Sequence, residues 1–170
     1  MLFTAFRSLA FPTITKQHVE RRLLRGVPAH HLFQIIQDVD RYKSFLPLCS
    51  HSQIISRLSP NEFRATLTVG FVPPLSDTYT SHVTVNPTAL TIQTKSIESK
   101  WLDSLQSMWK LEAANDGQDC HVDFSMSLTT SDPIILQTLD QVMKQVANQQ
   151  VTAFETRCRQ IPVVIEDDMP

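Results

Sequence analysis

The adjacent stretches CHVDFSMSL (residues 120–128) and SDPIILQTLDQVMKQVANQQVTAFETRC (residues 131–158) differ completely in hydrophobic period. In the first, apolar and polar side chains alternate, which is the period of a strand with one buried face. In the second, Asp132 is suited to an N-cap and Pro133 to the first turn, and no glycine or proline follows until Pro162. About 27 residues at 1.5 Å each predict a helix roughly 40 Å long, which can cross a whole sheet.

The apolar residues of this helix form one stripe. Its members are Ile135, Leu139, Val142, Met143, Val146, Ala153 and Phe154. Gln150 falls within the stripe, and Arg157 lies near the same line at the far end. A buried amide without a partner costs about 1 to 3 kcal/mol, so Gln150 is expected to bond to protein or to something bound. An ordinary glutamine near the helix end remains the other interpretation.

The strand period recurs upstream. It is present in HVERRLL (18–24), SQIISRL (52–58), FRATLTVGF (63–71), TYTSHVTV (78–85), LTIQTKSI (90–97) and SLQSMWKLEA (104–113). Short connections, including the hairpin turn NDGQD (115–119), join most of these segments. About seven strands of this kind predict an antiparallel meander with one apolar face. VPAHHLFQIIQDVDRYKSFL (27–46) predicts two short helices separated by a break near Asp40.

The order of these elements predicts an α+β helix-grip fold. A curved antiparallel sheet of about seven strands would wrap around the long C-terminal helix and leave a hydrophobic cavity between them. We expect the domain to span residues 17–160, preceded by a basic segment (1–16) and followed by an acidic tail (161–170). Because no acidic residue precedes Glu20, the basic segment suggests either a mitochondrial presequence or a plain basic tail.

Composition restricts the function classes. The 170 residues suffice for one domain, and a net charge of -2 with 19% charged residues does not favour nucleic acid as a partner. The three cysteines form no CxxC pair, which suits a reducing compartment better than a disulfide framework. No apolar run approaches the roughly 20 residues of a membrane helix, so any membrane contact is expected to be peripheral.

No motif for catalysis or metal binding is visible. The adjacent His30 and His31 would point about 100° apart on a helix, and the nearby Cys49 and His51 have no third ligand close in sequence. Phosphate loops, nucleophile elbows and dinucleotide fingerprints are absent from the sequence. The inward strand faces are expected to lack carboxylates, with Glu112 and Asp123 pointing outward. An enzyme would require an acid and a base that meet in the cavity, and the only candidates are His82, Tyr79 and Gln150.

Several segments together resemble a known family. They are VDRYKSFLPLCSHSQIISR (39–57), FRATLTVGFVPPLSDTYTSHV (63–83), SLQSMWKLEA (104–113), VDFSMSL (122–128) and the terminal helix with Phe154 and Arg157. Across roughly residues 17–160 the chain is similar to the coenzyme Q-binding proteins, which belong to the START-like polyketide cyclase/dehydrase superfamily. Leu48 stands where that family carries tryptophan, and Asp77 where it usually carries glutamate.

The resemblance implies a non-enzymatic carrier or chaperone for ubiquinone or a related polyprenyl lipid. Such a protein would lie peripherally on the matrix side of the mitochondrial inner membrane, without a catalytic cofactor and with ubiquinone as its bound ligand. It would support respiratory electron transport and ubiquinone biosynthesis, in contact with quinone-synthesis or respiratory complexes. Two alternatives stay open: a cyclase or hydratase using the same cavity, and a ribosome-associated regulatory protein like bacterial proteins of similar sequence.

Two sets of site residues follow. The expected ligand-binding residues are Tyr42, Phe45, Pro47, Leu48, Leu67, Val69, Phe71, Trp109, Phe124, Met126, Met143, Val146 and Gln150, with ordinary core as the other interpretation of the apolar ones. The expected membrane-contact residues are Lys43, Val72, Pro73, Pro74 and Leu75. The last four belong to the apolar turn FVPPL (71–75), which we interpret as a gate at the rim of the cavity. Each large apolar side chain there would contribute about 1.5 to 3 kcal/mol if buried in a bilayer or over a ligand.

Overall fold

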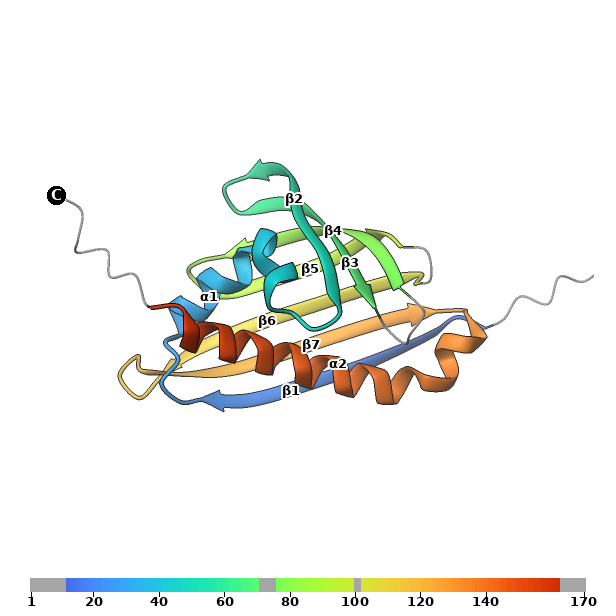
Figure 1. Ribbon diagram of the computed structural model, residues 1–170. Coiled ribbons are helices and arrows are strands. Elements are labelled where there is room, and N and C mark those ends of the chain that lie inside the picture. The colour runs from blue at the N-terminus through green and yellow to red at the C-terminus, as the bar shows by residue number, and fades with distance from the viewer. Residues whose placement is uncertain (1–11, 71–75, 100–101, 163–170) are drawn as a thin grey trace, which may run out of the picture.

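A computed structural model describes residues 12–70, 76–99 and 102–162 of the chain (Figure 1). The elements are β1 (Ile14–Leu24), α1 (Ala29–Gln37), the 3-10 helix η1 (Val39–Ser44), β2 (Cys49–Ser59), β3 (Glu62–Gly70), β4 (Ser76–Asn86), β5 (Thr91–Glu98), β6 (Ser104–Ala114), β7 (Asp119–Thr130) and α2 (Pro133–Gln160). This order confirms the predicted α+β helix-grip fold.

The described strands form one antiparallel sheet in the order β1-β7-β6-β5-β4-β3-β2. Consecutive strands from β2 to β7 are neighbours, and β1 closes the order beside β7. The pairing of β2 with β3 is irregular between Cys49 and His51, between Ile54 and Ser56, and between Arg57 and Ser59. Such bulges bend a strand. In Figure 1 the β2 and β3 end of the sheet accordingly rises away from the plane of β6, β7 and β1.

The helix α2 runs along β7 and β1 on the concave face of the sheet (Figure 1). Asp132 caps its N-terminus as predicted, because its carboxylate accepts hydrogen bonds from the backbone N–H groups of Ile134 (2.8 Å) and Ile135 (3.2 Å).

At the C-terminal end of α2, His31 Nε2 lies 2.9 Å from the carbonyl oxygen of Ile161 and 3.2 Å from that of Cys158. Both partners are acceptors, so His31 donates through Nε2 to carbonyl groups that the helix leaves unpaired.

The buried stripe of α2 is rotated from the predicted one. Its buried residues are Leu139, Met143, Ala147, Val151, Phe154 and Cys158. Val142, Val146 and Ala153, which the sequence placed in the stripe, are only partly buried. The reason is that α2 packs on β1 and β7 by one side, while its neighbouring side, with Val142 and Val146, faces a cavity over the rest of the sheet.

The short helices are separated at Asp38, close to the expected break near Asp40. β1 begins at Ile14, three residues before the expected start of the domain, whose bounds stay a prediction. One further expectation was wrong. The concave face does carry carboxylates: Asp77 is 3% exposed and accepts a hydrogen bond of 2.6 Å from Ser99 Oγ, and Glu20 accepts one of 2.7 Å from Arg22. These acids are tolerated because both are hydrogen-bonded.

Candidate ligand-binding cavity

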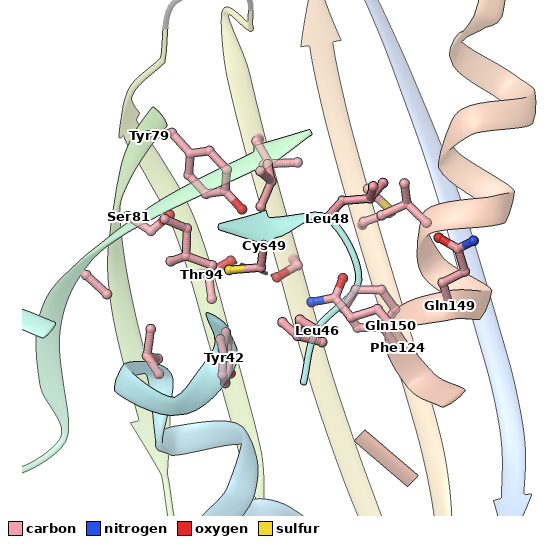
Figure 2. A pocket seen from close by; sticks show the side chains of 18 of the residues that line it. Tyr42, Leu46, Leu48, Cys49, Tyr79, Ser81, Thr94, Phe124, Gln149 and Gln150 are labelled. Carbon is pink, nitrogen blue, oxygen red and sulfur yellow. Dashed lines mark hydrogen bonds between the residues drawn. The ribbon is translucent and has the colours of Figure 1, made fainter. Parts of the chain in front are cut away.

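A cavity of about 150 Å³ lies between the concave face of the sheet, the η1–β2 segment and α2 (Figure 2). Its wall comprises Ile36, Val39, Tyr42, Leu46, Pro47, Leu48, Cys49, Ala65, Leu67, Val69, Gly70, Tyr79, Ser81, Val83, Ile92, Thr94, Leu105, Ser107, Trp109, Phe124, Met126, Leu128, Val142, Met143, Val146, Gln149 and Gln150. The wall therefore unites β2 through β7 with one side of α2. Alternation along each strand explains this, since every second side chain faces inward.

Most of the expected ligand-binding residues lie in this wall. They are Tyr42, Pro47, Leu48, Leu67, Val69, Trp109, Phe124, Met126, Met143, Val146 and Gln150. Phe45 does not line the cavity. Its ring packs behind the wall, 5.8 Å from the ring of Tyr42 and 5.2 Å from that of Phe154, with the Arg157 guanidinium 5.4 Å from its centroid. Whether the lining residues bind a ligand stays a prediction.

The expected membrane-contact residues are mostly outside the described part of the chain. Val72, Pro73, Pro74 and Leu75, together with the expected wall residue Phe71, fall in residues 71–75 and are not described. Lys43 is exposed on η1, and its backbone N–H donates to Ser52 Oγ at 3.0 Å. Among the described residues no helix is long and apolar enough to cross a membrane.

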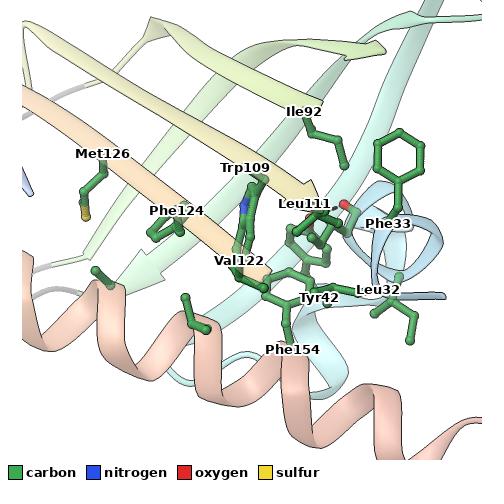
Figure 3. Close-up of a cluster of buried hydrophobic side chains, with 14 of the residues drawn as sticks. Leu32, Phe33, Tyr42, Ile92, Trp109, Leu111, Val122, Phe124, Met126 and Phe154 are labelled. Carbon is green, nitrogen blue, oxygen red and sulfur yellow. Dashed lines mark hydrogen bonds between the residues drawn. The ribbon is translucent and has the colours of Figure 1, made fainter. Parts of the chain in front are cut away.

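An aromatic cluster closes one end of the cavity (Figure 3). The Phe154 ring of α2 lies 5.1 Å from Tyr42 and 5.1 Å from Trp109, in both cases close to perpendicular. Trp109 in turn lies 4.4 Å from Phe124 across the β6–β7 pairing. Edge-to-face rings of this kind pack at interior density, so this end of the cavity is firmly built.

Neutral polar groups gather in another part of the wall. Tyr79 and Ser81 stand two residues apart on β4 and so share the concave face, and Cys49 faces them from the start of β2 (Figure 2). Thr94 Oγ1 and Ser107 Oγ form a hydrogen bond of 2.7 Å between β5 and β6. From the opposite wall α2 contributes Gln149 and Gln150. The sequence analysis named Tyr79 only as a candidate for an enzyme and gave Ser81 and Ser107 no role; hydroxyl side chains at alternate strand positions were the available signal.

The wall is electrically neutral near physiological pH. Among the described residues that line the cavity there is no Asp, Glu, His, Lys or Arg. Burial raises the pKa of the Tyr79 hydroxyl above its usual value, and the nearby Cys49 and Asp77 raise this pKa further. Burial likewise raises the pKa of the Cys49 thiol, although its contact with the carbonyl of His51 opposes this slightly. The cavity therefore offers apolar surface and uncharged hydrogen-bonding groups.

Leu48 marks the mouth of the cavity. Its side chain lines the wall and is nevertheless 52% exposed. Its backbone φ is 63°, in the left-handed region that a branched residue rarely adopts, and its carbonyl oxygen accepts a hydrogen bond of 2.9 Å from the N–H of Gly70. The contact between the η1–β2 segment and the end of β3 thus holds an apolar side chain at the solvent boundary.

The residues considered for an enzyme are not brought together. Tyr79 and Gln150 line the cavity, but His82 lies on the other face of β4, where Nε2 is 3.9 Å from the carboxylate of Glu62. The Cys49 thiol donates to the backbone carbonyl of His51 at 3.3 Å rather than pairing with the imidazole. Within the described part of the chain no group of three or more His, Cys, Asp or Glu side chains is placed to hold a metal ion.

Residues 26–155 match the family model described as polyketide cyclase/dehydrase and lipid transport. The chain belongs to this family. The match covers most of the domain, including α1, the whole sheet except β1, and most of α2. The description of this family names both enzymes, the polyketide cyclases and dehydrases, and lipid transport.

Individual relatives point to different activities. The chain is 32% identical over 144 residues to the ribosome association toxin RatA of Pseudomonas aeruginosa, covering 85% of this chain and 96% of that protein. It is 27% identical over 160 residues to a mitochondrial coenzyme Q-binding protein, COQ10 homolog B of Xenopus laevis, covering 92% of this chain but only 64% of that protein. The Zhui aromatase/cyclase of a Streptomyces species superposes with a TM-score of 0.74 at 14% identity, covering 88% of this chain and 95% of that chain. That likeness concerns the fold alone.

Proposed function

We propose that the chain is a carrier that holds a polyprenyl quinone, ubiquinone, with the ring in the cavity and the tail leaving past Leu48. The observation that carries this proposal is an apolar wall free of charged side chains among the described residues, with an apolar residue exposed at its mouth. Similarity to the Xenopus coenzyme Q-binding protein supports the choice of ligand.

The volume of the cavity determines how much of the ligand it can enclose. An apolar cavity of about 150 Å³ is of the order that holds one benzene-sized ring, whereas pockets for drug-sized ligands have volumes of roughly 300 to 1,000 Å³. The ring therefore enters and most of the isoprenoid tail stays outside the enclosed space. Because each buried CH₂ is worth about 0.8 kcal/mol, a single shielded isoprene unit contributes roughly 3 to 4 kcal/mol. A membrane surface against the mouth would shield the remainder.

The cellular setting belongs to the same proposal. We place the carrier peripherally at the matrix side of the mitochondrial inner membrane, with Lys43 and residues 72–75 at the lipid surface and residues 17–160 as the lipid-binding domain. It would deliver quinone for respiration and for quinone synthesis without catalysing a reaction. The absence of an acid or base from the described cavity wall supports a carrier over a cyclase or hydratase.

Ribosome association is the second candidate, favoured by similarity to RatA over 96% of that protein. Contact with ribosomal RNA requires basic side chains that are free to meet phosphates. On the outer face of the sheet two of the cations are instead paired, Arg21 with Asp123 at 3.0 Å and Lys110 with Glu112 at 2.9 Å. The net charge of -2 likewise disfavours binding to ribosomal RNA.

Solvent extraction tests the carrier. Protein purified from a quinone-producing host is extracted and analysed by mass spectrometry, beside Val146→Trp, which fills the cavity, and Ile134→Trp, on the same helix but 66% exposed. We expect quinone from the wild type and Ile134→Trp and none from Val146→Trp. Recovery of no polyprenyl lipid from any of the three, together with co-sedimentation with ribosomes, would replace the carrier by the second candidate.

A further inference from the structure

Several hydroxyl side chains that face each other on this sheet are hydrogen-bonded to one another. Thr66 pairs with Thr80 at 3.3 Å and Thr68 with Thr78 at 2.8 Å on the outer face. The Thr94–Ser107 pair does the same inside the cavity, at 2.7 Å. Paired hydroxyls are the normal state of polar groups in a folded protein, because leaving one buried and unbonded loses free energy.

Two hydroxyls in the cavity depart from this pattern. Ser81 is 4% exposed and lines the cavity, yet its Oγ has no hydrogen-bond partner among the described residues. The Tyr79 hydroxyl, on the same face of β4, likewise has none within the described ranges. On the β3 side Ser81 is opposite Ala65 and Tyr79 is opposite Leu67, and neither partner has a polar side chain. On the β5 side Ser81 is opposite Ser96, whose Oγ instead accepts a hydrogen bond of 2.8 Å from the backbone N–H of Leu105. Both hydroxyls are therefore available to a molecule inside the cavity.

A third group approaches from the opposite wall. Gln150 of α2 lines the cavity, and its amide makes no hydrogen bond to the side chains that the structure describes. In Figure 2 the Tyr79 hydroxyl turns toward Cys49, and the Gln150 amide nitrogen points into the cavity from the other side. Polar groups that make no hydrogen bond to described residues thus stand on two walls, with apolar side chains between them, among them Leu67, Trp109 and Phe124.

We propose that Tyr79 and Ser81 bind an oxygen on one side of a flat neutral ring while Gln150 binds an oxygen on its opposite side. Resting on the proposed carrier function, this assigns the ring of the quinone to these three residues. Hydroxyl and amide groups can donate or accept hydrogen bonds, so the same residues satisfy a quinone, which only accepts, and a quinol, which also donates. A lipid with an ionised carboxylate or phosphate is rejected, because the described wall has no cation to meet it.

Equilibrium binding with three probes tests this assignment. The probes are ubiquinone with one isoprene unit, its quinol, and a linear isoprenoid hydrocarbon without a ring. The variants are Tyr79→Phe with Ser81→Ala, and Gln150→Leu; Thr80→Val is the matched control, since it removes a hydroxyl from the outer face of the same strand. Denaturant unfolding of each ligand-free variant is the second readout.

We expect Gln150→Leu to weaken binding of both quinone and quinol about fivefold to tenfold, and the double variant to weaken it more, while hydrocarbon binding is unchanged. The double variant is expected to be no less stable without ligand, because the hydroxyls it loses make no bond to described residues; a purely structural pair would instead lower stability. Unchanged quinone affinity in both variants would overturn the assignment of the ring to these three residues but not the proposed carrier function. Failure of the wild type to bind any isoprenoid probe overturns the carrier as well.

Discussion

The Phe154 ring of α2 lies 5.1 Å from the Trp109 ring of β6, with the two planes at 74°. Phe154 is fully buried and Trp109 is 2% exposed, and the same Phe154 ring also meets Tyr42 of η1. One side chain therefore joins the long helix, the centre of the sheet and the short helix at the closed end of the cavity. The cavity retains its shape because this end is packed as core.

Replacing Phe154 is expected to cost much of the stability of the domain. Phe154→Ala removes a fully buried ring and leaves a void, so we expect a loss of about 3 to 5 kcal/mol in the free energy of unfolding. Urea unfolding followed by circular dichroism measures it. Ile134→Ala, at a position on the same helix that is 66% exposed, should stay within about 0.5 kcal/mol of wild type. A loss below 1 kcal/mol in Phe154→Ala would contradict the packing described.

His31 is predicted to stabilise the C-terminal end of α2. Its Nε2–H is the donor to the carbonyl groups of Ile161 and Cys158, so His31→Ala leaves buried acceptors unpaired and should cost about 1 to 3 kcal/mol. His30→Ala, in the same helix α1 but exposed, is the control and should be nearly neutral. Amide hydrogen exchange in the last turn of α2 should be faster in His31→Ala than in His30→Ala. Equal exchange rates in the two variants would show that His31 does not stabilise this end of the helix.

Thr94 and Ser107 offer a double-mutant cycle inside the cavity. Thr94→Val leaves the Ser107 hydroxyl without its partner 2.7 Å away, and we expect it to cost about 1 to 3 kcal/mol. Adding Ser107→Ala removes the orphaned group, so the double variant should be more stable than the sum of the single changes by about 0.5 to 1.5 kcal/mol. Unfolding curves of the four proteins give the coupling. Strict additivity would mean that the bond contributes nothing.

Glu20 is predicted to make folding sensitive to acid. The side-chain hydrogen bond from Arg22 holds the pKa of Glu20 below its usual value of 4.5, helped by His18, although partial burial opposes the shift. A lowered folded-state pKa gives stability that is complete above the unfolded-state pKa and is lost as the pH falls through the folded-state pKa. Glu20→Gln should therefore reduce the loss of stability below about pH 4.5, measured as urea midpoints at neutral and acid pH. Exposed Glu98→Gln is the control; parallel curves for wild type and Glu20→Gln would contradict the prediction.

Periodicity and the order of the elements predicted the fold that the structure has. Alternation in β3, β4, β6 and β7 identified the concave face, and Asp132 with Pro133 fixed the start of α2. The same alternation placed Leu67, Trp109 and Phe124 in what proved to be the cavity wall. These predictions succeeded because a half-buried strand has only two faces, so one buried residue assigns all the others.

The details that failed depend on contacts between distant segments. Phe45 was expected in the wall, but packing against Phe154 and Arg157 turns its ring behind it. Asp77 was not recognised as buried, because its partner Ser99 lies 22 residues away and nothing in the local sequence announces the bond. The rotation of the α2 stripe likewise reflects which side of the helix meets β1, which helical periodicity alone leaves undetermined.

Leu48 is predicted to act in ligand binding rather than in folding. The left-handed backbone of Leu48, at φ 63°, lowers stability, and so does the exposure of 52% of this apolar residue to water. Such strained positions are concentrated at functional sites. Leu48→Gly relieves the backbone and should leave stability within about 1 kcal/mol of wild type, yet weaken binding of one-isoprene ubiquinone about fivefold by removing apolar surface from the mouth. Leu48→Asn separates the two effects, because asparagine tolerates this backbone region and has a similar size but a polar end. If Leu48→Asn binds the quinone as tightly as wild type, Leu48 is a structural corner and the tail leaves the cavity elsewhere.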